Sequence, residues 1–134
     1  MDISSFDDLL AAARAQSEPQ RLLFVFTRAE LPDDASAEQR AQFELGYGGA
    51  LVPAVCVDKG LNELSTFEAF VEESRQFSLD WAIVFAATLS GRDGKSPTTA
   101  DAEEPLNQMV AAIKAGTISG FIPFNNKGEP VRLG

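Results

Sequence analysis

Five polar side chains stand where the sequence could assemble a binding site, because each follows the end of an apolar run. They are Arg28, Asp58, Lys59, Ser90 and Arg92. In an open parallel sheet, ligands gather beyond the carboxyl ends of the strands. If the apolar runs are parallel strands, the five side chains rim one crevice and form a candidate small-molecule site. The alternative is that strand ends are polar simply because the chain turns there.

Catalytic chemistry finds little support in the residue types. The chain has no histidine and one cysteine. Histidine is the most common general base and metal ligand, and the common dyads with serine or cysteine also need it. We therefore assign no catalytic residue, expect no cofactor, and leave open only a weak enzymatic activity at the strand ends.

The single cysteine, Cys56, lies inside the apolar run "LVPAVCV". Strand alternation places it on one face with Val52 and Ala54, and places Val55 and Val57 on the other. Because both faces are apolar, we predict a buried thiol with a raised pKa that reacts slowly in the native protein. Reactive cysteines need a cationic neighbour, a helix N-terminus or a partner cysteine.

The loop 89–99, "LSGRDGKSPTT", ends in a Gly-Lys-Ser triplet typical of a phosphate-binding loop. That motif requires a glycine where this chain has Leu89, and Pro97 removes an amide that would hold phosphate. We predict a solvated, mobile loop instead. The second glycine cluster, residues 46–49, leaves a helix and enters a strand, so we predict a turn that exposes Tyr47 as a contact residue.

Acidic residues form four adjacent pairs, and no pair has the spacing of a metal site. Neighbours in a helix point about 100° apart, so an adjacent pair does not focus two carboxylates on one ion. No spacing resembles a calcium loop, and we predict no metal site. The pairs are Asp7/Asp8, Asp33/Asp34, Glu72/Glu73 and Glu103/Glu104.

Length and charge limit the class of protein. The 134 residues suit one domain, 1–134, with its own hydrophobic core. The net charge of −9 repels nucleic-acid phosphates and anionic lipid, so we expect neither partner. The start "MDISSFDDLL" is acidic where a secretory signal is basic, and no 18-residue apolar run follows, so we expect an acidic cytoplasmic protein.

Four apolar runs alternate with segments of helical periodicity. The runs are residues 21–26, 51–57, 81–89 and 121–124, and the first three have the nearly continuous apolar character of strands covered on both faces. Pro53 and Pro123 place the second and fourth runs near a sheet edge or put the proline at a strand end. The tail "FIPFNNKGEPVRL" predicts a hairpin.

The helical segments have recognisable ends. We predict helix starts at Ser4 or Ser5, at Ser36 with Gln39, and at Ser65 with Glu68. The last helix should carry Pro105 in its first turn and end at Gly116, as the second should end at Gly46.

This pattern predicts an α/β fold in the order α-β-α-β-α-β-α-β-β. We expect a single-domain sandwich with a four- to five-stranded mixed sheet and about four helices, its strands joined by parallel crossovers. A thioredoxin-like fold without Cys-x-x-Cys is the alternative.

Several stretches resemble a family of short bacterial proteins often labelled ribonucleotide reductase subunit alpha. They are "RLLFVF", "GGALVPAVCVDK", "FVEESRQF" followed after two residues by "DWAIVF", and "MVAAIKAGTISGFIPFNNKGEPV". A reductase alpha subunit uses three cysteines, whereas this chain has one, so no reductase residue carries over. The resemblance therefore implies a bacterial origin and no reductase activity.

Two functions from different classes remain after these exclusions. The first is a non-catalytic domain that binds a protein partner or associates with itself as a homo-oligomer, which suits a chain without a catalytic constellation. The second is a small-molecule-binding domain with a site at the carboxyl ends of the strands.

Overall fold

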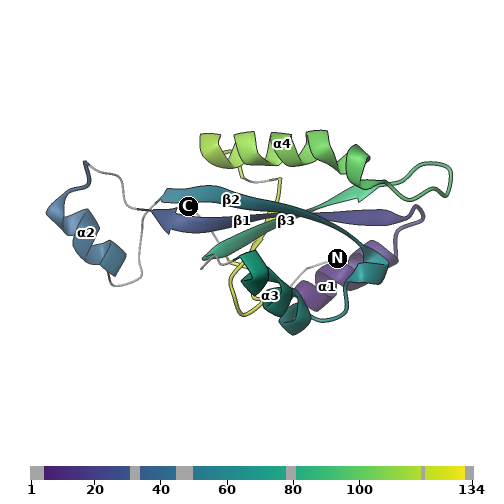
Figure 1. Ribbon diagram of the computed structural model, residues 1–134, viewed down its shortest axis with the longest axis horizontal. Helices are drawn as coiled ribbons and strands as arrows, with labels where there is room; N and C mark the ends of the chain where they lie inside the picture. The colour runs from purple at the N-terminus through teal and green to yellow at the C-terminus, as the bar shows by residue number, and fades with distance from the viewer. Residues whose placement is uncertain (1–4, 31–33, 45–49, 78–80, 119, 132–134) are drawn as a thin grey trace.

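The computed structural model describes residues 5–30, 34–44, 50–77, 81–118 and 120–131. It has four α-helices and four strands, as the predicted α/β class requires (Figure 1). Two short 3₁₀ helices, η1 and η2, flank α3. In chain order the elements are α1 (Phe6–Arg14), β1 (Gln20–Glu30), α2 (Ala37–Glu44), β2 (Ala50–Gly60), η1 (Leu61–Glu63), α3 (Phe67–Ser74), η2 (Arg75–Phe77), β3 (Ile83–Ser90), α4 (Thr99–Ala115) and β4 (Ile122–Phe124).

The sheet has the strand order β2-β1-β3-β4, and all three pairs are antiparallel. The predicted mixed sheet is therefore wrong for the described strands. Of the predicted parallel crossovers, only the connection from β2 to β3 joins strands that run in the same direction. The thioredoxin-like alternative also loses support, because that arrangement contains parallel neighbours. The predicted sequence of helices and strands is otherwise retained through β4.

The predicted parallel crossover from β1 to β2 is wrong because of the position of α2. A crossover helix must cover the sheet, but α2 projects beyond one end of it (Figure 1). Residues 36–41, which span its N-terminal half, are exposed. Over these residues the helix offers the sheet no buried face. The chain therefore returns from α2 at the end where it left, and β1 and β2 pair as an antiparallel hairpin with a long insertion.

The connection from β2 to β3 runs through η1, α3 and η2. Both strands are antiparallel to β1, so they run in the same direction, but β1 lies between them. Helical periodicity between β2 and β3 thus predicted their relative direction correctly, and the structure adds that β1 separates them.

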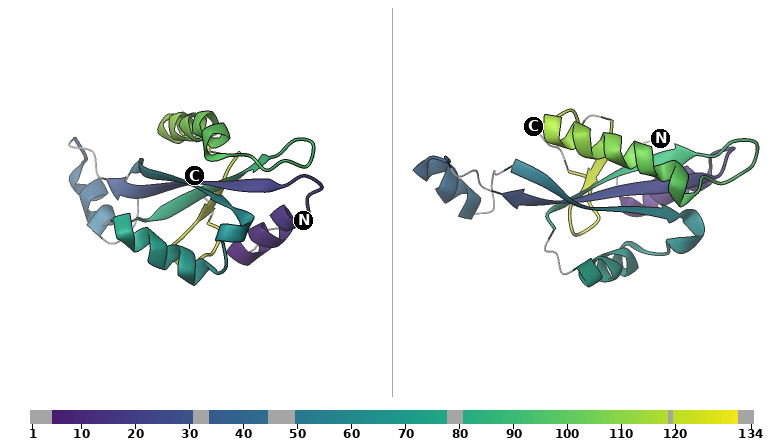
Figure 2. Two further views of the ribbon diagram at one scale, coloured as in Figure 1. Left: turned by 45° about the vertical axis from the view of Figure 1, so that its right-hand side comes forward. Right: turned by 45° about the horizontal axis from the view of Figure 1, so that its top comes forward.

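Helices cover both faces of the sheet. Leu22, Phe24 and Phe26 of β1 face α1 and α3, whereas Leu23 and Val25 face α4. Figures 1 and 2 show α4 on one side of the sheet and α1 with α3 on the other. Because β1 is central and both of its faces are covered, its apolar run is nearly continuous.

Both prolines lie on outermost strands, as predicted. Pro53 is in β2 and Pro123 is in β4, the two ends of the strand order. The Pro123 carbonyl accepts a hydrogen bond from Val131, and Asn125 donates to Glu129, which closes the predicted C-terminal hairpin. Its second arm is an isolated bridge between Phe124 and Pro130 rather than a strand.

Two predicted helix starts are confirmed and one is wrong by a residue. The Ser5 hydroxyl accepts from the Asp8 amide, and Ser36 forms the predicted reciprocal pair with Gln39. The cap of α3 is Thr66 rather than Ser65, because the Thr66 hydroxyl accepts from the Ala69 amide.

The last helix starts earlier than predicted. The N-terminal cap of α4 is Thr98, which exchanges hydrogen bonds with Asp101, so Pro105 lies inside the helix rather than in its first turn. This reciprocal cap satisfies the first amides and outweighs the local preference of Pro105 for a helix start. The helix ends at Gly116 with φ 79°, as predicted.

Candidate functional site

The five predicted site residues do not meet in one crevice, because β1 runs against its neighbours. Arg28 lies opposite Val52 near one end of the sheet. Asp58 lies opposite Leu23, and Ser90 lies opposite Gln20 near the start of β1. The structure thus brings Asp58, Lys59, Ser90 and Arg92 to one end of the sheet and leaves Arg28 near the other, where it pairs with Glu30 at 2.8 Å.

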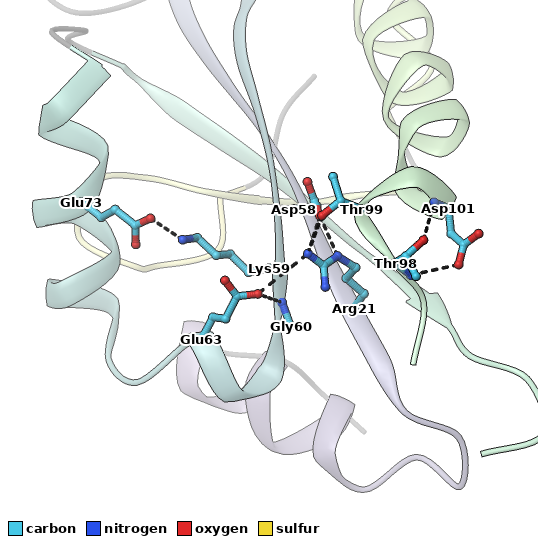
Figure 3. Close-up of polar contacts among 9 residues, drawn as sticks. All are labelled: Arg21, Asp58, Lys59, Gly60, Glu63, Glu73, Thr98, Thr99 and Asp101. Atoms are coloured by element: carbon cyan, nitrogen blue, oxygen red, sulfur yellow. Dashed lines mark hydrogen bonds and ion pairs between the residues drawn. The ribbon is translucent and has the colours of Figure 1, made fainter. Parts of the chain in front are cut away.

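Asp58 and Lys59 are adjacent in sequence but face opposite sides of the sheet. Asp58 points toward α4, since its partner Leu23 belongs to the core on that side. Lys59 points the other way and forms an ion pair with Glu73 of α3 (Figure 3). The alternation of a strand imposes this separation, so the two charges cannot hold the same small ligand.

Arg21 is the residue that sequence reasoning missed at this end. Its Nε donates to Asp58 Oδ2 over 2.6 Å, and its Nη2 donates to Thr99 Oγ1 over 3.0 Å (Figure 3). The Thr99 hydroxyl in turn donates to Asp58 Oδ2 over 2.9 Å. The charged position that opens the "RLLFVF" run was the available signal, but only an antiparallel β1 places it beside Asp58.

The cluster of Arg21, Asp58 and Thr99 joins β1, β2 and the start of α4. The Arg21 and Asp58 side chains are each 16% exposed, so the pair is well shielded from water. Glu63 of η1 lies 3.8 Å from Arg21 and accepts from the Gly60 amide. Because Asp58 already has both a cation and a hydroxyl donor, we assign this cluster a structural role rather than a ligand-binding one.

A pocket of about 450 Å³ at the same end of the sheet is lined by two of the predicted residues, Ser90 and Arg92. Its wall is the connection from β3 to α4. Arg92 and Lys95 exchange backbone hydrogen bonds of 3.2 and 2.9 Å, and Asp93 and Gly94 have φ of 54° and 77°. Two successive positive φ angles are typical of the Asp-Gly hairpin turn. Within the predicted loop 89–99, residues 92–95 therefore form a tight hairpin rather than a phosphate-binding loop.

The pocket carries both signs of charge. Arg92 and Lys95 line it, and so do Asp93 and Asp101. Hydrogen bonds from Thr98, first from its backbone and then from its side chain, lower the pKa of Asp101, and Arg92 adds to this. Asp101 is therefore anionic at neutral pH and caps its own helix, which opposes binding of a polyphosphate there.

Cys56 is exposed, so the predicted core position is wrong. The core beneath α4 is made by β1, β3 and α4, whereas Cys56 lies on the outermost strand. An apolar run in an edge strand does not have to be covered on both faces. Partial burial of the thiol still raises the pKa of Cys56, as predicted.

The exposure of Cys56 and its raised pKa together predict a thiol that is accessible but weakly nucleophilic. We expect a maleimide to label Cys56 in the folded protein without prior unfolding, and more slowly than in the urea-unfolded chain at the same pH. The raised pKa reduces the thiolate fraction of the native state, so the native pH–rate profile should be displaced to higher pH. Labelling only after unfolding would contradict the exposed position.

Metal-binding clusters and membrane-spanning helices are both absent from the residues that the structure describes. No group of three or more histidine, cysteine, aspartate or glutamate side chains there could hold a metal ion. None of the helices in those ranges is both long and apolar enough to span a membrane. The predicted turn 46–49 with Tyr47 lies outside the described residues, as does Gly46.

Comparison with known proteins adds no assignment to this geometry. No protein-family model matches the chain, and neither a curated protein nor a solved structure matches it. The resemblance to short bacterial proteins labelled as reductase subunits therefore stays an expectation from the sequence.

Proposed function

We propose that this chain is a non-catalytic protein-binding domain that receives a strand of its partner along the outer edge of β2. The observation that carries the proposal is the outermost position of this 11-residue strand among the strands that the structure describes. Residues 50–57, "ALVPAVCV", include no charged side chain. A strand edge presents unpaired N–H and C=O groups, which a partner strand can use.

Only part of this edge is protected against pairing. Natural edge strands are guarded by proline, by bulges or by charge. Pro53 lies in the first half of β2, and the β1–β2 register shifts between Phe26 and Thr27, which leaves Ala54 without a partner. From Val55 to Gly60 the register is regular, so this half of the strand supplies the docking edge.

A pull-down with three forms of the chain tests the proposal. Wild type, Cys56→Ala and Cys56→Pro are immobilised and exposed to lysate from cells that also express an untagged copy of the chain. Proline at position 56 removes an outward amide and leaves the β1–β2 hydrogen bonds in place. Retention of the same protein by wild type and Cys56→Ala, with loss in Cys56→Pro, supports edge docking. Equal retention by all three forms, or by none, contradicts it.

The pocket lined by Ser90 and Arg92 supports a second candidate function, the binding of a small molecule. The pocket of about 450 Å³ is of ligand size and holds cationic, anionic and hydroxyl groups. The binding of a ligand to the native state alone raises the melting temperature by mass action.

A thermal-shift screen with nucleotides, sugar phosphates and other metabolites tests this second candidate. A ligand at a hundred times its Kd should stabilise by about 2.7 kcal/mol, which corresponds to a shift of several degrees. Arg92→Ala should lose the shift, whereas Lys127→Ala, an exposed change outside the pocket, should keep it. No shift across the panel contradicts the candidate.

A further inference from the structure

We infer that the strand that docks on β2 is β2 of a second copy of this chain, paired antiparallel about a two-fold axis at Val57. This inference rests on the edge-docking function proposed above. It would join two four-stranded sheets into one continuous sheet. Three features of β2 favour this pairing: the backbone groups that face outward, the residues that keep those groups available, and the charge along the edge.

The outward-facing groups follow from the hydrogen bonds at the end of the sheet. The Gly91 amide donates to the Pro19 carbonyl over 2.7 Å, so these two residues form a hydrogen-bonded pair that continues the β1–β3 register. Successive residues of a strand direct their N–H and C=O groups to alternate sides. Odd-numbered residues of β1 from Arg21 to Val25 therefore direct their backbone N–H and C=O groups toward β3. The even-numbered residues direct theirs toward β2.

The same alternation continues across β2. Val55, Val57 and Lys59 lie opposite even-numbered residues of β1 and direct their backbone groups inward. Cys56 and Asp58 consequently direct theirs outward. The Gly60 amide agrees with this alternation, because it donates to the Glu63 side chain and not to β1.

The ends of this segment are closed to a docking strand. Pro53 has no amide hydrogen, Ala54 is the residue displaced by the bulge, and the Gly60 amide is already bonded to Glu63. Within the regular, described half of the strand, Cys56 and Asp58 are the residues that offer both an outward donor and an outward acceptor.

These two residues complement each other in a second copy. With the two-fold axis at Val57, Cys56 lies opposite Asp58 of the other copy, and Asp58 lies opposite its Cys56, which uses all four outward groups in each chain. An axis at Cys56 would place Asp58 against the bulge at Ala54. An axis at Asp58 would oppose two carboxylates and require the occupied Gly60 amide. Self-pairing about Val57 is therefore the register that the edge favours.

The local charge also suits a second copy better than a basic partner. The chain as a whole has a net charge of −9, which attracts cations. At this edge, however, Asp58 is paired with Arg21, and Glu73 is paired with Lys59 (Figure 3). A basic strand would find no unpaired carboxylate in β2, whereas a second copy of the same edge, with its charges paired in the same way, needs no countercharge. Because the remaining acidic surfaces repel, added salt should strengthen the dimer.

Light scattering over a range of concentrations tests the inference, and charge variants test the register. Wild type and Cys56→Ser should form dimers, and Cys56→Pro should be monomeric. Cys56→Glu faces Asp58 of the other copy and should weaken the dimer roughly two- to thirtyfold, since two like-charge pairs form. Cys56→Lys should not weaken it. If the axis were at Cys56, the Glu and Lys variants would repel themselves equally, which would overturn the register.

A short bifunctional maleimide provides a second measurement. In the Val57 register the two Cys56 residues are diagonal neighbours, with Cα atoms roughly 7–8 Å apart. Wild type should be crosslinked as a dimer, and Cys56→Ser should not. A wild type that stays monomeric at every concentration overturns the second-copy inference. If the pull-down then retains another protein in an edge-dependent way, the proposed function survives; if it retains none, both fail.

Discussion

Replacing Phe6 with alanine is expected to destabilise the protein by about 3–5 kcal/mol, the usual cost of truncating a buried phenylalanine. Phe6 is 1% exposed and packs on the rings of Phe24, Phe67, Phe70 and Phe124 at centroid separations of 6.0, 5.1, 5.3 and 5.7 Å. The ring therefore connects α1 to β1, α3 and β4. Total stabilities of small domains are about 5–15 kcal/mol, so the variant should lose a large part of the whole. Urea unfolding followed by circular dichroism measures the loss.

Phe121→Ala is the matched control for this change. Phe121 is half-buried and packs at the margin of the other core, beneath α4. The same truncation there removes less apolar surface from the core and should cost clearly less. Equal losses at the two positions would show that Phe6 is not the central contact between helices and sheet.

Gly91→Ala is expected to cost about 3 kcal/mol, the upper part of the usual range for overpacking. A Cβ atom at Gly91 would lie 2.0 Å from the Lys95 carbonyl oxygen and 3.2 Å from that of Pro19. Both neighbours are backbone atoms, so no side chain can rotate away. The 92–95 hairpin and the hydrogen bond between Gly91 and Pro19 must shift together, which should also alter the pocket that contains Ser90 and Arg92. Urea unfolding measures the loss, and amide chemical shifts of residues 91–97 report the displacement.

Two other glycines separate this contact from the general cost of adding a side chain. Gly94 has φ 77° with nothing within 4 Å of the added atom, so Gly94→Ala should cost roughly 1–2 kcal/mol from the left-handed backbone alone. Gly120 has neither a positive φ nor a close neighbour, and Gly120→Ala should be nearly neutral. A Gly91→Ala variant as stable as Gly120→Ala would contradict the close approach of the hairpin to the end of β1.

The features that sequence reasoning predicted correctly depend on neighbouring residues. Ser5 and the Ser36–Gln39 pair cap helices because a side chain reaches an amide three residues away. Gly116 ends α4 because its backbone adopts a left-handed conformation. Pro53 and Pro123 lie on outermost strands because a missing amide is tolerated there. These constraints act over a few residues and can be read from the chain directly.

The five residues of the predicted site do not lie together, and the reason cannot be read from local sequence patterns. The prediction grouped these five residues because it took strands separated by helical segments to be parallel. Whether a helix covers the sheet or projects beyond it depends on the whole fold, and α2 projects. Reversal of β1 relative to its neighbours moved Arg28 away from the other four residues and brought Arg21 to Asp58.

By itself, the sequence determined the α/β class, the order of helices and strands through β4, the edge positions of both prolines and the lack of a histidine for catalysis. Periodicity, caps and composition contain this information. Only the tertiary structure decided strand direction and adjacency, because both depend on contacts between segments distant in sequence. Those contacts left β2 on the outside, exposed Cys56 and turned the backbone of Cys56 and Asp58 outward. The apolar run around Cys56 has the same sequence whether its strand is central or outermost in the sheet. Its neighbours in space therefore determine whether it forms part of the core or a docking edge.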